Sequence, residues 1–259
     1  MRLDKFLAEA SVGSRKIIRN FVKDGMITVN NKKITDPAVE IEESMDVIRY
    51  LGKRITHPGK MYYMFHKPQG CITATKDLDN KTVLDYFAED CRKGLFPIGR
   101  LDKDTEGLLL LTNDGEFSHK LMYPDKHVEK TYFFWAFGTL SREAKGSLKT
   151  GIDIGEGEHL AKAVKLEIEE EGLYLELQDK MKLTNIKGIR INPFHQPVVS
   201  GFITITEGRK HQVKRMLKAA GCYIVYLKRT SIGGLTLDDT LKKGHYRELT
   251  KEEYWKLTH

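Results

Sequence analysis

The chain has 259 residues, of which 40% are hydrophobic and 31% are charged, a balance that is ordinary for a soluble globular protein of one or two domains. It carries 43 Lys and Arg against 36 Asp and Glu, and the net charge of +7 is compatible with a polyanionic partner. Three widely spaced cysteines argue against a disulfide framework and a thiolate zinc site, and the absence of a long apolar run or an apolar leader indicates a cytoplasmic protein without a membrane span.

The first 54 residues read as a small separate module. Apolar residues recur at helical spacing over 3–10, and again in a second stretch that begins near Ser14, a suitable N-cap. The apolar face of this second helix is predicted to consist of Ile17, Ile18, Phe21 and Val22. After Gly25, the run ITVNNKKIT places two β-prone segments around Asn30 and Asn31, which predicts a hairpin.

The remainder reads as a larger second domain. The polar stretch GKRITHPGK contains the linker, which we place at 55–60, so that the division is 1–54, 55–60 and 61–259. Beyond it the pattern predicts a strand from Met61, a turn over 67–70 and a strand over 131–138. It also predicts helices over 82–91 and 116–122, and a hairpin over 161–179 that turns near Glu171 and Gly172. Many strands with a few helices predict an α+β domain on a mixed, mainly antiparallel sheet.

The central stretch is FPIGRLDKDTEGLLLLTNDG, residues 96–115. A polar loop lies between Gly99 and Gly107, and the four leucines after it read as a buried strand that ends in a tight turn. Such a loop can hold a carboxylate in a cleft, or it can be a solvated connection. Composition alone does not choose among its three acids, Asp102, Asp104 and Glu106.

This stretch resembles the signature of the pseudouridine synthases, in the branch of RsuA, RluB, RluE and RluF. Further matching motifs follow in order along the chain: MFHKPQG at 64–70, VEKTY at 128–132, EGRKHQVKRM at 207–216 and then LKRTSIGGLTL. The N-terminal module resembles the RNA-binding domain named after ribosomal protein S-four. The resemblance implies isomerisation of a uridine in ribosomal RNA without metal, nucleotide or other cofactor.

The resemblance also implies which residues act. Asp102, the D of GRLD, matches the catalytic aspartate, which attacks the sugar or acts as a base that starts glycal formation. Lys214 matches its basic partner, and Tyr132 matches the tyrosine that stacks on the flipped uracil and helps to remove the carbon 5 proton. Leu227 matches an apolar residue that packs beside the catalytic pair. Without the resemblance, Lys214 would read as a surface lysine, and Tyr132 and Leu227 as core residues.

Two basic clusters predict contacts with phosphates. Residues 207–229 carry seven Lys or Arg against one acid, and residues 1–33 carry eight against three. Arg100 is expected to fill the gap left by an extruded nucleotide. The residues expected to hold the RNA backbone beside the site are Arg209, His211, Gln212 and Arg215, and those on the N-terminal module are Arg2, Lys5, Arg15, Lys16 and Arg19. Any single one of these can instead be a solvated surface charge.

One segment departs from the family pattern. The connection before the strand GFITITEG carries KMKLTNIKGIRINPFHQPVVS, residues 180–200, which is longer than the direct link expected in this branch. Its basic residues include Lys180, Lys182, Lys187 and Arg190. The segment is either a basic flap over RNA or an extra hairpin with no role.

The sequence leaves more than one substrate and more than one class of function open. The motifs GRLDKDTEG and HQVKRM and the ending GHYRELTKEE most resemble an enzyme of 16S rRNA, free or in an assembling small subunit, and we expect a monomer. The same reaction on 23S rRNA is the alternative. From other classes, the chain can be a non-catalytic RNA-binding assembly factor, or a metal-dependent nuclease that uses Asp102, Asp104 and Glu106. The nine histidines show no metal-binding spacing.

Overall fold

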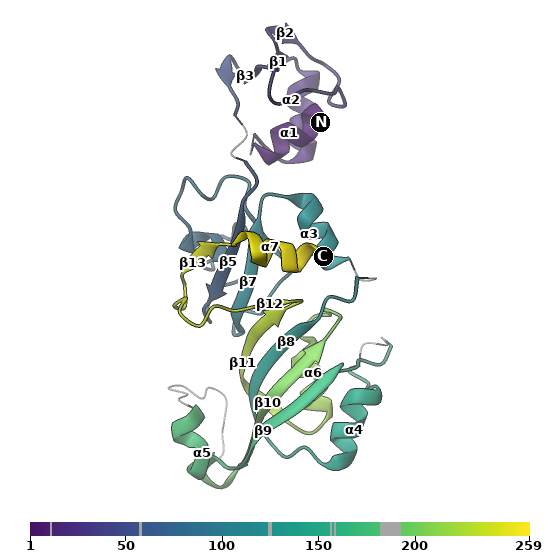
Figure 1. Cartoon of the computed structure of the whole chain (residues 1–259), viewed down its shortest axis with the longest axis vertical. Helices are drawn as coiled ribbons and strands as arrows, with labels where there is room; N and C mark the ends of the chain where they lie inside the picture. Colours follow the sequence, from purple (N-terminus) through teal and green to yellow (C-terminus); the bar gives the residue numbers. More distant parts are fainter. Residues whose placement is uncertain (11, 57–58, 124–125, 156, 158, 182–192) are drawn as a thin grey trace.

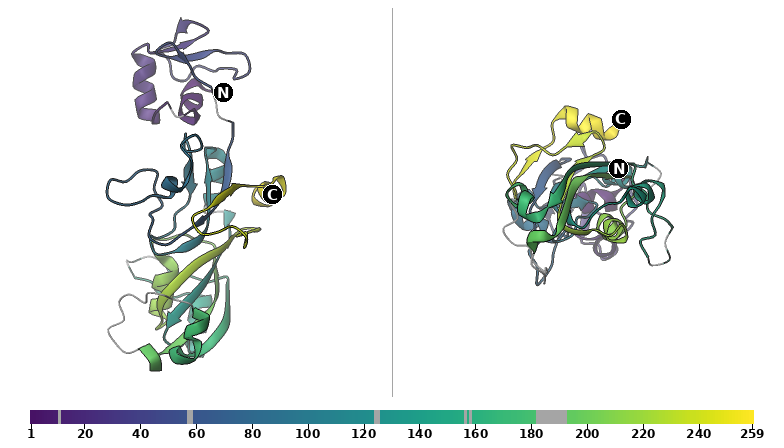
Figure 2. Two further views of the ribbon diagram at one scale, coloured as in Figure 1. Left: turned by 90° about the vertical axis from the view of Figure 1, so that its left-hand side faces the viewer. Right: turned by 90° about the horizontal axis from the view of Figure 1, so that it is seen from below.

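The computed structural model of the chain describes residues 1–259 except 11, 57–58, 124–125, 156, 158 and 182–192. Figure 1 shows a small N-terminal body above a longer body that holds the other elements, and Figure 2 shows both from the side and from below. The described residues form one sheet of four strands and one of nine. Helices accompany both sheets, so the predicted α+β class is confirmed.

The N-terminal body combines two helices with an antiparallel sheet of order β2-β1-β3-β4. Its elements are α1 (Leu3–Glu9), α2 (Arg15–Lys23), β1 (Ile27–Val29), β2 (Lys32–Lys33), β3 (Ile48–Tyr50) and β4 (Lys53–Arg54). The predicted start of α2 is confirmed, because the Ser14 hydroxyl accepts a hydrogen bond from the backbone N–H of Ile17. The predicted hairpin is confirmed too: Asn30 and Asn31 both have positive φ, as a two-residue turn between twisted strands requires.

One apolar cluster joins the helices of this body to its sheet. Its buried members are Leu3, Phe6, Leu7, Ile18, Val22, Ile27, Ile41 and Ile48. The prediction for Ile17 is wrong, since 47% of this residue is exposed. Ile18 and Val22 lie one helical turn apart and point at the sheet, which leaves Ile17 at the edge of the apolar face. The hairpin of β3 and β4, which turns at Leu51 and Gly52, was not predicted.

The larger sheet forms the second body. Its main path has the order β13-β5-β7-β11-β8-β10-β9. The strands are β5 (Tyr62–Lys67), β7 (Glu106–Thr112), β8 (Lys130–Phe137), β9 (Lys165–Leu173), β10 (Pro197–Ile205), β11 (Tyr223–Ile232) and β13 (Tyr246–Glu248). Two short strands lie off this path: β6 (Phe96–Ile98) pairs with β7, and β12 (Leu235–Thr236) pairs with β11. β7 and β11 are parallel and the other described pairs are antiparallel, so the predicted mixed sheet is confirmed.

Helices cover both faces of this sheet, as Figure 1 shows. They are α3 (Gly115–Met122), α4 (Arg142–Thr150), α5 (Tyr174–Met181), α6 (Gln212–Ala219) and α7 (Lys251–Thr258), with the short 3-10 helices η1 (Val83–Tyr86) and η3 (Pro193–His195). Leu109 and Leu111 of β7 face the cluster that α4 and α6 cover, whereas Leu108 and Leu110 face the cluster that α3 and α7 cover. The leucine run is therefore the predicted buried strand, apolar throughout because both of its faces are covered.

The predicted hairpin over 161–179 is wrong. Only its middle part forms a strand, β9, and this strand pairs with β10 instead of with the residues that follow it. The rest becomes α5, because Leu177 and Met181 lie one helical turn apart and pack against Trp135 and Val198 on the outer face of the sheet. The alternating sequence allows a strand or a helix, and this packing selects the helix.

The predicted helix over 82–91 is wrong as well, whereas the helix predicted over 116–122 is confirmed as α3. The capping box of Thr82 and Asp85 starts only a 3-10 helix, η1. Phe87 then takes an extended conformation, which stacks its ring on Tyr246 at a centroid distance of 3.9 Å. The aromatic contact ends the helix.

The segment 180–200 lies mostly outside the described residues. The structure describes the end of α5 before the gap at 182–192, and then η3 and the start of β10. The predicted flap or hairpin with Lys182, Lys187 and Arg190 falls in that gap. In the described part of the chain, no helix is long and apolar enough to cross a membrane.

Candidate active site

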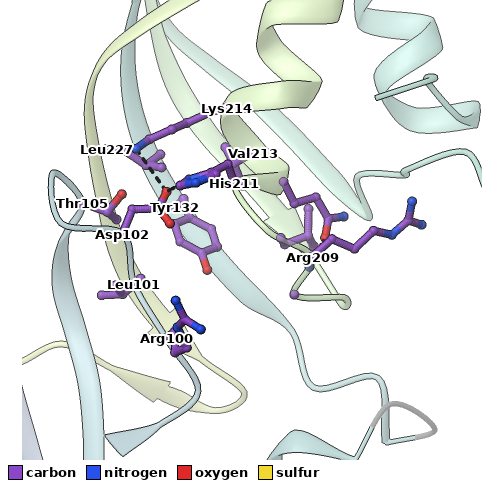
Figure 3. Close-up of a pocket in the computed structure, with 13 residues that line it drawn as sticks. Arg100, Leu101, Asp102, Thr105, Tyr132, Arg209, His211, Val213, Lys214 and Leu227 are labelled. Carbon is purple, nitrogen blue, oxygen red and sulfur yellow. Dashed lines mark hydrogen bonds and ion pairs between the residues drawn. The ribbon is translucent and has the colours of Figure 1, made fainter. Parts of the chain in front are cut away.

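A pocket opens in the larger body where the loop before β7 meets α6, β8 and β11 (Figure 3). Eight of the predicted site residues line it: Arg100, Asp102, Tyr132, Arg209, His211, Gln212, Lys214 and Leu227. Other lining residues are Leu101, Thr105, Ile205, Gly208 and Val213. The predicted residues outside the lining are Arg215, Arg2, Lys5, Arg15, Lys16 and Arg19. Segments more than 100 residues apart in the sequence thus meet around Asp102.

Lys67 holds the main chain of the loop that carries Asp102. This side chain is fully buried at the end of β5, and its ammonium group donates to the backbone carbonyls of Asp102 and Thr105, both at 2.9 Å. A third, longer bond of 3.2 Å goes to the carbonyl of Pro68. Burial lowers the pKa of Lys67. The sequence assigned Lys67 only to a turn, yet it holds the main chain on which Asp102 sits.

Gly107 lies directly after this loop, as the second residue of β7, and allows β7 and β11 to pair in parallel. Its φ is +108°, a conformation that disfavours residues with a Cβ. A Cβ at this position would lie 2.2 Å from the backbone oxygen of Arg229, its partner across the strands. Only glycine permits this approach, which brings the loop and the end of β11 to the same pocket.

The Asp102 carboxylate is held by two donors on one oxygen. Oδ2 lies 3.1 Å from the Lys214 ammonium and 3.0 Å from Nδ1 of His211, as the dashed lines in Figure 3 show. Burial acts to raise the pKa of Asp102, but the His211 hydrogen bond and the Lys214 charge outweigh it and lower that pKa below its ordinary value. Asp102 is therefore ionised at neutral pH, although only 26% of its side chain is exposed.

The three acids, Asp102, Asp104 and Glu106, differ in exposure and in the residues that they contact. The Asp104 side chain is 73% exposed at the rim, where it also contacts Lys214. Glu106 is 2% exposed and binds the Tyr226 hydroxyl and the Lys243 ammonium. Because Glu106 is engaged there, the three carboxylates do not converge. Within the described residues, no group of three His, Cys, Asp or Glu is placed to hold a metal ion.

The start of α6 supplies both donors to Asp102. Lys214 lies in the first turn, and His211 is the N-cap residue. Gln212 is buried, and its side-chain oxygen accepts from the backbone N–H of Arg209 at 2.9 Å, which closes the loop before the helix. The sequence predicted His211 and Gln212 as RNA contacts; in the structure both make contacts within the protein.

The two arginines of this region also bind the protein. Arg209 pairs with Glu207, with 2.7 Å from Nε to the carboxylate, and a second nitrogen donates to the backbone carbonyl of His159. Arg215 donates to the carbonyls of Ile154 at 2.9 Å and Gly155 at 3.0 Å. These bonds tie α6 to the loop after α4. Their predicted RNA contacts stay predictions.

Tyr132 and Leu227 line the pocket from the sheet, on β8 and β11. Tyr132 lies on β8 and is nearly buried, and its cross-strand partner on β11 is Arg229. Figure 3 shows its hydroxyl directed toward the part of the pocket where the exposed Arg100 lies. Leu227 is buried and belongs to the same apolar cluster as Tyr132.

Arg229 is a buried residue that the sequence pattern predicted only as one member of a basic cluster. It is 3% exposed, its Nε donates to the Leu108 carbonyl at 2.8 Å, and its guanidinium carbon lies 6.0 Å from the centre of the Tyr132 ring. The sequence could have indicated its burial. In the strand YIVYLKRTSI, Arg229 lies two residues after the buried Leu227 and therefore on the same face, where an arginine must find partners inside the fold.

The cations of the N-terminal body differ in availability. Arg2 pairs with Asp4 at 2.9 Å, and Lys5 pairs with Glu116 of α3 at 2.5 Å. On α2, the side chains of Arg15, Lys16 and Arg19 are exposed and have no ion pair with any residue that the structure describes.

Comparison with known proteins agrees with this architecture. Residues 61–219 match the RNA pseudouridylate synthase family, and residues 1–48 match the S4 domain. The chain belongs to the RsuA-type pseudouridine synthases. A crystal structure of a pseudouridylate synthase, 32% identical, superposes with a TM-score of 0.64 and covers 99% of both chains.

Relatives of this synthase match it over nearly its whole length. It is 41% identical to an uncharacterised RNA pseudouridine synthase of Bacillus subtilis, over 98% of this chain and 96% of the relative. It is 37% identical to the ribosomal large subunit pseudouridine synthase B of the same organism, over 99% and 95%. It is 35% identical to the ribosomal small subunit pseudouridine synthase A of Escherichia coli, over 98% of both. The protein is thus a pseudouridine synthase.

Proposed function

We propose that this synthase converts a uridine of ribosomal RNA, preferably 16S rRNA, to pseudouridine with Asp102 as the catalytic residue. The observation that supports this most is the carboxylate of Asp102, which is ionised and held on Oδ2 by Lys214 and His211. Among the described residues, no donor binds its other oxygen, Oδ1. Oδ1 is therefore the atom available for the sugar.

The reaction requires one bond to break and one to form at the same sugar carbon. The bond from N1 of uracil to C1′ breaks, the base rotates, and C5 bonds to C1′, while C5 loses a proton and N1 gains one. Asp102 starts this sequence by attack on C1′ or as the base that forms a glycal. Lys214 keeps the carboxylate charged in a half-buried site.

Tyr132 and Leu227 fit the second half of the reaction. Their side chains line the pocket beside Asp102, where a flipped base can stack on the tyrosine ring. The Tyr132 hydroxyl is then available to help remove the proton from C5. Neither role requires a metal or an organic cofactor.

RNA enters from a basic rim. Arg100 is exposed beside the pocket and can occupy the gap that the extruded uridine leaves in the RNA. Arg209, Gln212 and Arg215 hold the loops of this rim through bonds within the protein. We propose that Arg209 and Arg215 also position the RNA backbone, whereas the buried Gln212 acts only through the loop. The N-terminal domain, which we place at 1–54 before a linker at 55–60, adds the exposed cations of α2. The catalytic domain then spans 61–259.

The choice of ribosomal RNA, and of 16S rRNA within it, draws on the relatives and on the motif wording. One relative is named for the large subunit and one for the small subunit, at 37% and 35% identity. These values do not separate the two RNAs, so the preference for 16S rRNA follows from GRLDKDTEG, HQVKRM and GHYRELTKEE. We propose a cytoplasmic monomer that acts on 16S rRNA, free or in an assembling small subunit.

Tritium release from RNA labelled at C5 of uridine tests the reaction and the substrate together. Wild type and Asp102→Asn are compared on 16S and 23S rRNA separately, with EDTA present, and on assembling ribosomal particles. We expect release from 16S rRNA that falls about 10³-fold or more in Asp102→Asn. Release from 23S rRNA alone would assign the other substrate.

Asp104→Asn is the matched control, because this acid lies two residues away on the same loop but is exposed at the rim. It should keep most of the activity. Equal losses in the two variants would contradict the role of Asp102. Release from no RNA or particle would favour the non-catalytic binding factor, and RNA cleavage that EDTA abolishes would favour the nuclease.

A further inference from the structure

We propose that His211 is a positioning residue for Asp102: its Nδ1–H holds Oδ2, so that Oδ1 faces the sugar of the bound uridine. This inference rests on the proposed function. It assigns to His211 a role different from the RNA contact that its place in a basic motif predicts. Figure 3 shows the imidazole ring directed at the Asp102 carboxylate from the start of α6.

The backbone of His211 is the first observation. It has φ +52° and ψ 28°, the left-handed region that residues other than glycine rarely occupy. Such a conformation persists where surrounding contacts over-determine it, and it is frequent at functional sites. Here it turns the side chain away from the helix it precedes and toward the loop of Asp102.

The helix start itself is the second observation. N-cap residues commonly use their side chains to accept from the first free N–H groups of the helix. His211 makes no such bond. The one polar contact of its side chain among the described residues is that of Nδ1 with Oδ2 of Asp102, at 3.0 Å. The side chain therefore serves the carboxylate and not the helix.

The third observation is that Lys214 divides its contacts. Its ammonium group contacts both Asp102 and the exposed Asp104, and a flexible lysine stem allows it to follow either. A single mobile cation does not define which carboxylate oxygen faces the substrate. The imidazole has only two rotatable bonds and binds Oδ2 alone, so it supplies the orientation that Lys214 lacks.

Three variants separate this role from RNA binding. His211→Gly removes the ring and suits the left-handed backbone. His211→Asn keeps a short amide donor near the position of Nδ1 and also tolerates that backbone. Ala219→Ser, an exposed and uncharged change on the last turn of the same helix, is the control.

The measurements are the single-turnover rate at saturating enzyme and the dissociation constant for the RNA that the wild type modifies. We expect His211→Gly to lower the rate about 10- to 100-fold while the dissociation constant stays within about twofold. His211→Asn should recover most of the rate, and Ala219→Ser should keep the wild-type rate.

Weaker RNA binding at an unchanged rate in His211→Gly would overturn the proposal in favour of an RNA contact. An Asn variant no faster than the Gly variant would overturn it as well. The pKa of the Asp102 carboxyl, followed by NMR in the free protein, gives a readout independent of catalysis: loss of the His211 bond should raise it. An unchanged pKa would refute the positioning contact even if no RNA were modified, whereas absence of turnover in the wild type would refute only the proposed function.

Discussion

The buried cations of the catalytic domain and the exposed cations of the N-terminal domain look alike in the sequence and behave oppositely in the structure. Lys67, Lys130 and Arg229 are 0%, 7% and 3% exposed, and each donates to backbone carbonyls. Arg15, Lys16 and Arg19 stand in solvent on one face of α2.

This difference decides what each charge can do. A buried ammonium group that binds carbonyls has exchanged water for the main chain, so it holds the fold and is not free to meet phosphate. An exposed cation keeps its hydration and can exchange counterions for RNA. The basic cluster at 207–229 therefore includes residues that hold the fold, such as Arg229, and not only candidates for RNA contacts.

The largest expected effect is that of Lys67→Met. The change removes the donor from two carbonyls of the Asp102 loop and from the carbonyl of Pro68, and we expect the free energy of unfolding to fall by about 2–4 kcal/mol. Tritium release should fall as well, because the loop no longer holds Asp102 in place. Urea denaturation measures the first effect. Lys103→Met, an exposed change on the Asp102 loop itself, is the control, and equal stability of the two variants would contradict the role of Lys67.

Lys130 gives a pH-dependent form of the same test. Burial, with a smaller effect from the charge of Arg229, lowers the pKa of Lys130 from 10.5 to about 8. Between these values the folded protein has released a proton that the unfolded chain still binds, so a rise in pH favours the folded state. We expect Lys130 to add about 2–3 kcal/mol of stability across this window.

Urea denaturation at pH 8 and at pH 10 measures this effect in wild type and in Lys130→Met. Stability should rise more with pH in the wild type than in the variant. Parallel pH profiles for the two proteins would show that Lys130 titrates normally.

The exposed cations of α2 are expected to affect RNA binding and not folding. Replacing Arg15, Lys16 and Arg19 together by Gln should weaken RNA binding about 10-fold and reduce the slope of log affinity against log salt by about 2. Thermal unfolding should barely change, because these side chains are in solvent. An unaltered salt dependence of binding, measured by filter binding from 50 to 200 mM salt, would remove α2 from the RNA surface.

The smallest effect is expected for the pair of Lys5 and Glu116, which joins α1 to α3. Lys5 was predicted as an RNA contact, and the structure pairs it with this exposed carboxylate. Solvent screens such a pair, so a double-mutant cycle with both residues changed to Ala should give a coupling below about 0.5 kcal/mol. A larger coupling would mean that the two domains are held together more firmly than exposed charges allow.

Local patterns in the sequence determined several elements because the physical cause was itself local. Ser14 caps α2, Asn30 and Asn31 make the turn of the first hairpin, and the four leucines of β7 form a buried strand. The motifs predicted site roles for Asp102, Tyr132, Lys214 and Leu227, and the fold brings these four residues to one pocket.

The tertiary structure alone decided the features whose cause lies far away in the chain. α5 forms a helix where alternation suggested a strand, because Leu177 and Met181 find Trp135 and Val198. Asp102 is separated from Asp104 and Glu106 only by what surrounds each carboxylate. His211 acquires its partner only when the start of α6 is placed against the loop before β7. These outcomes depend on burial and on distances between remote segments. A local stretch of sequence determines neither quantity, because both arise only when the segments pack together.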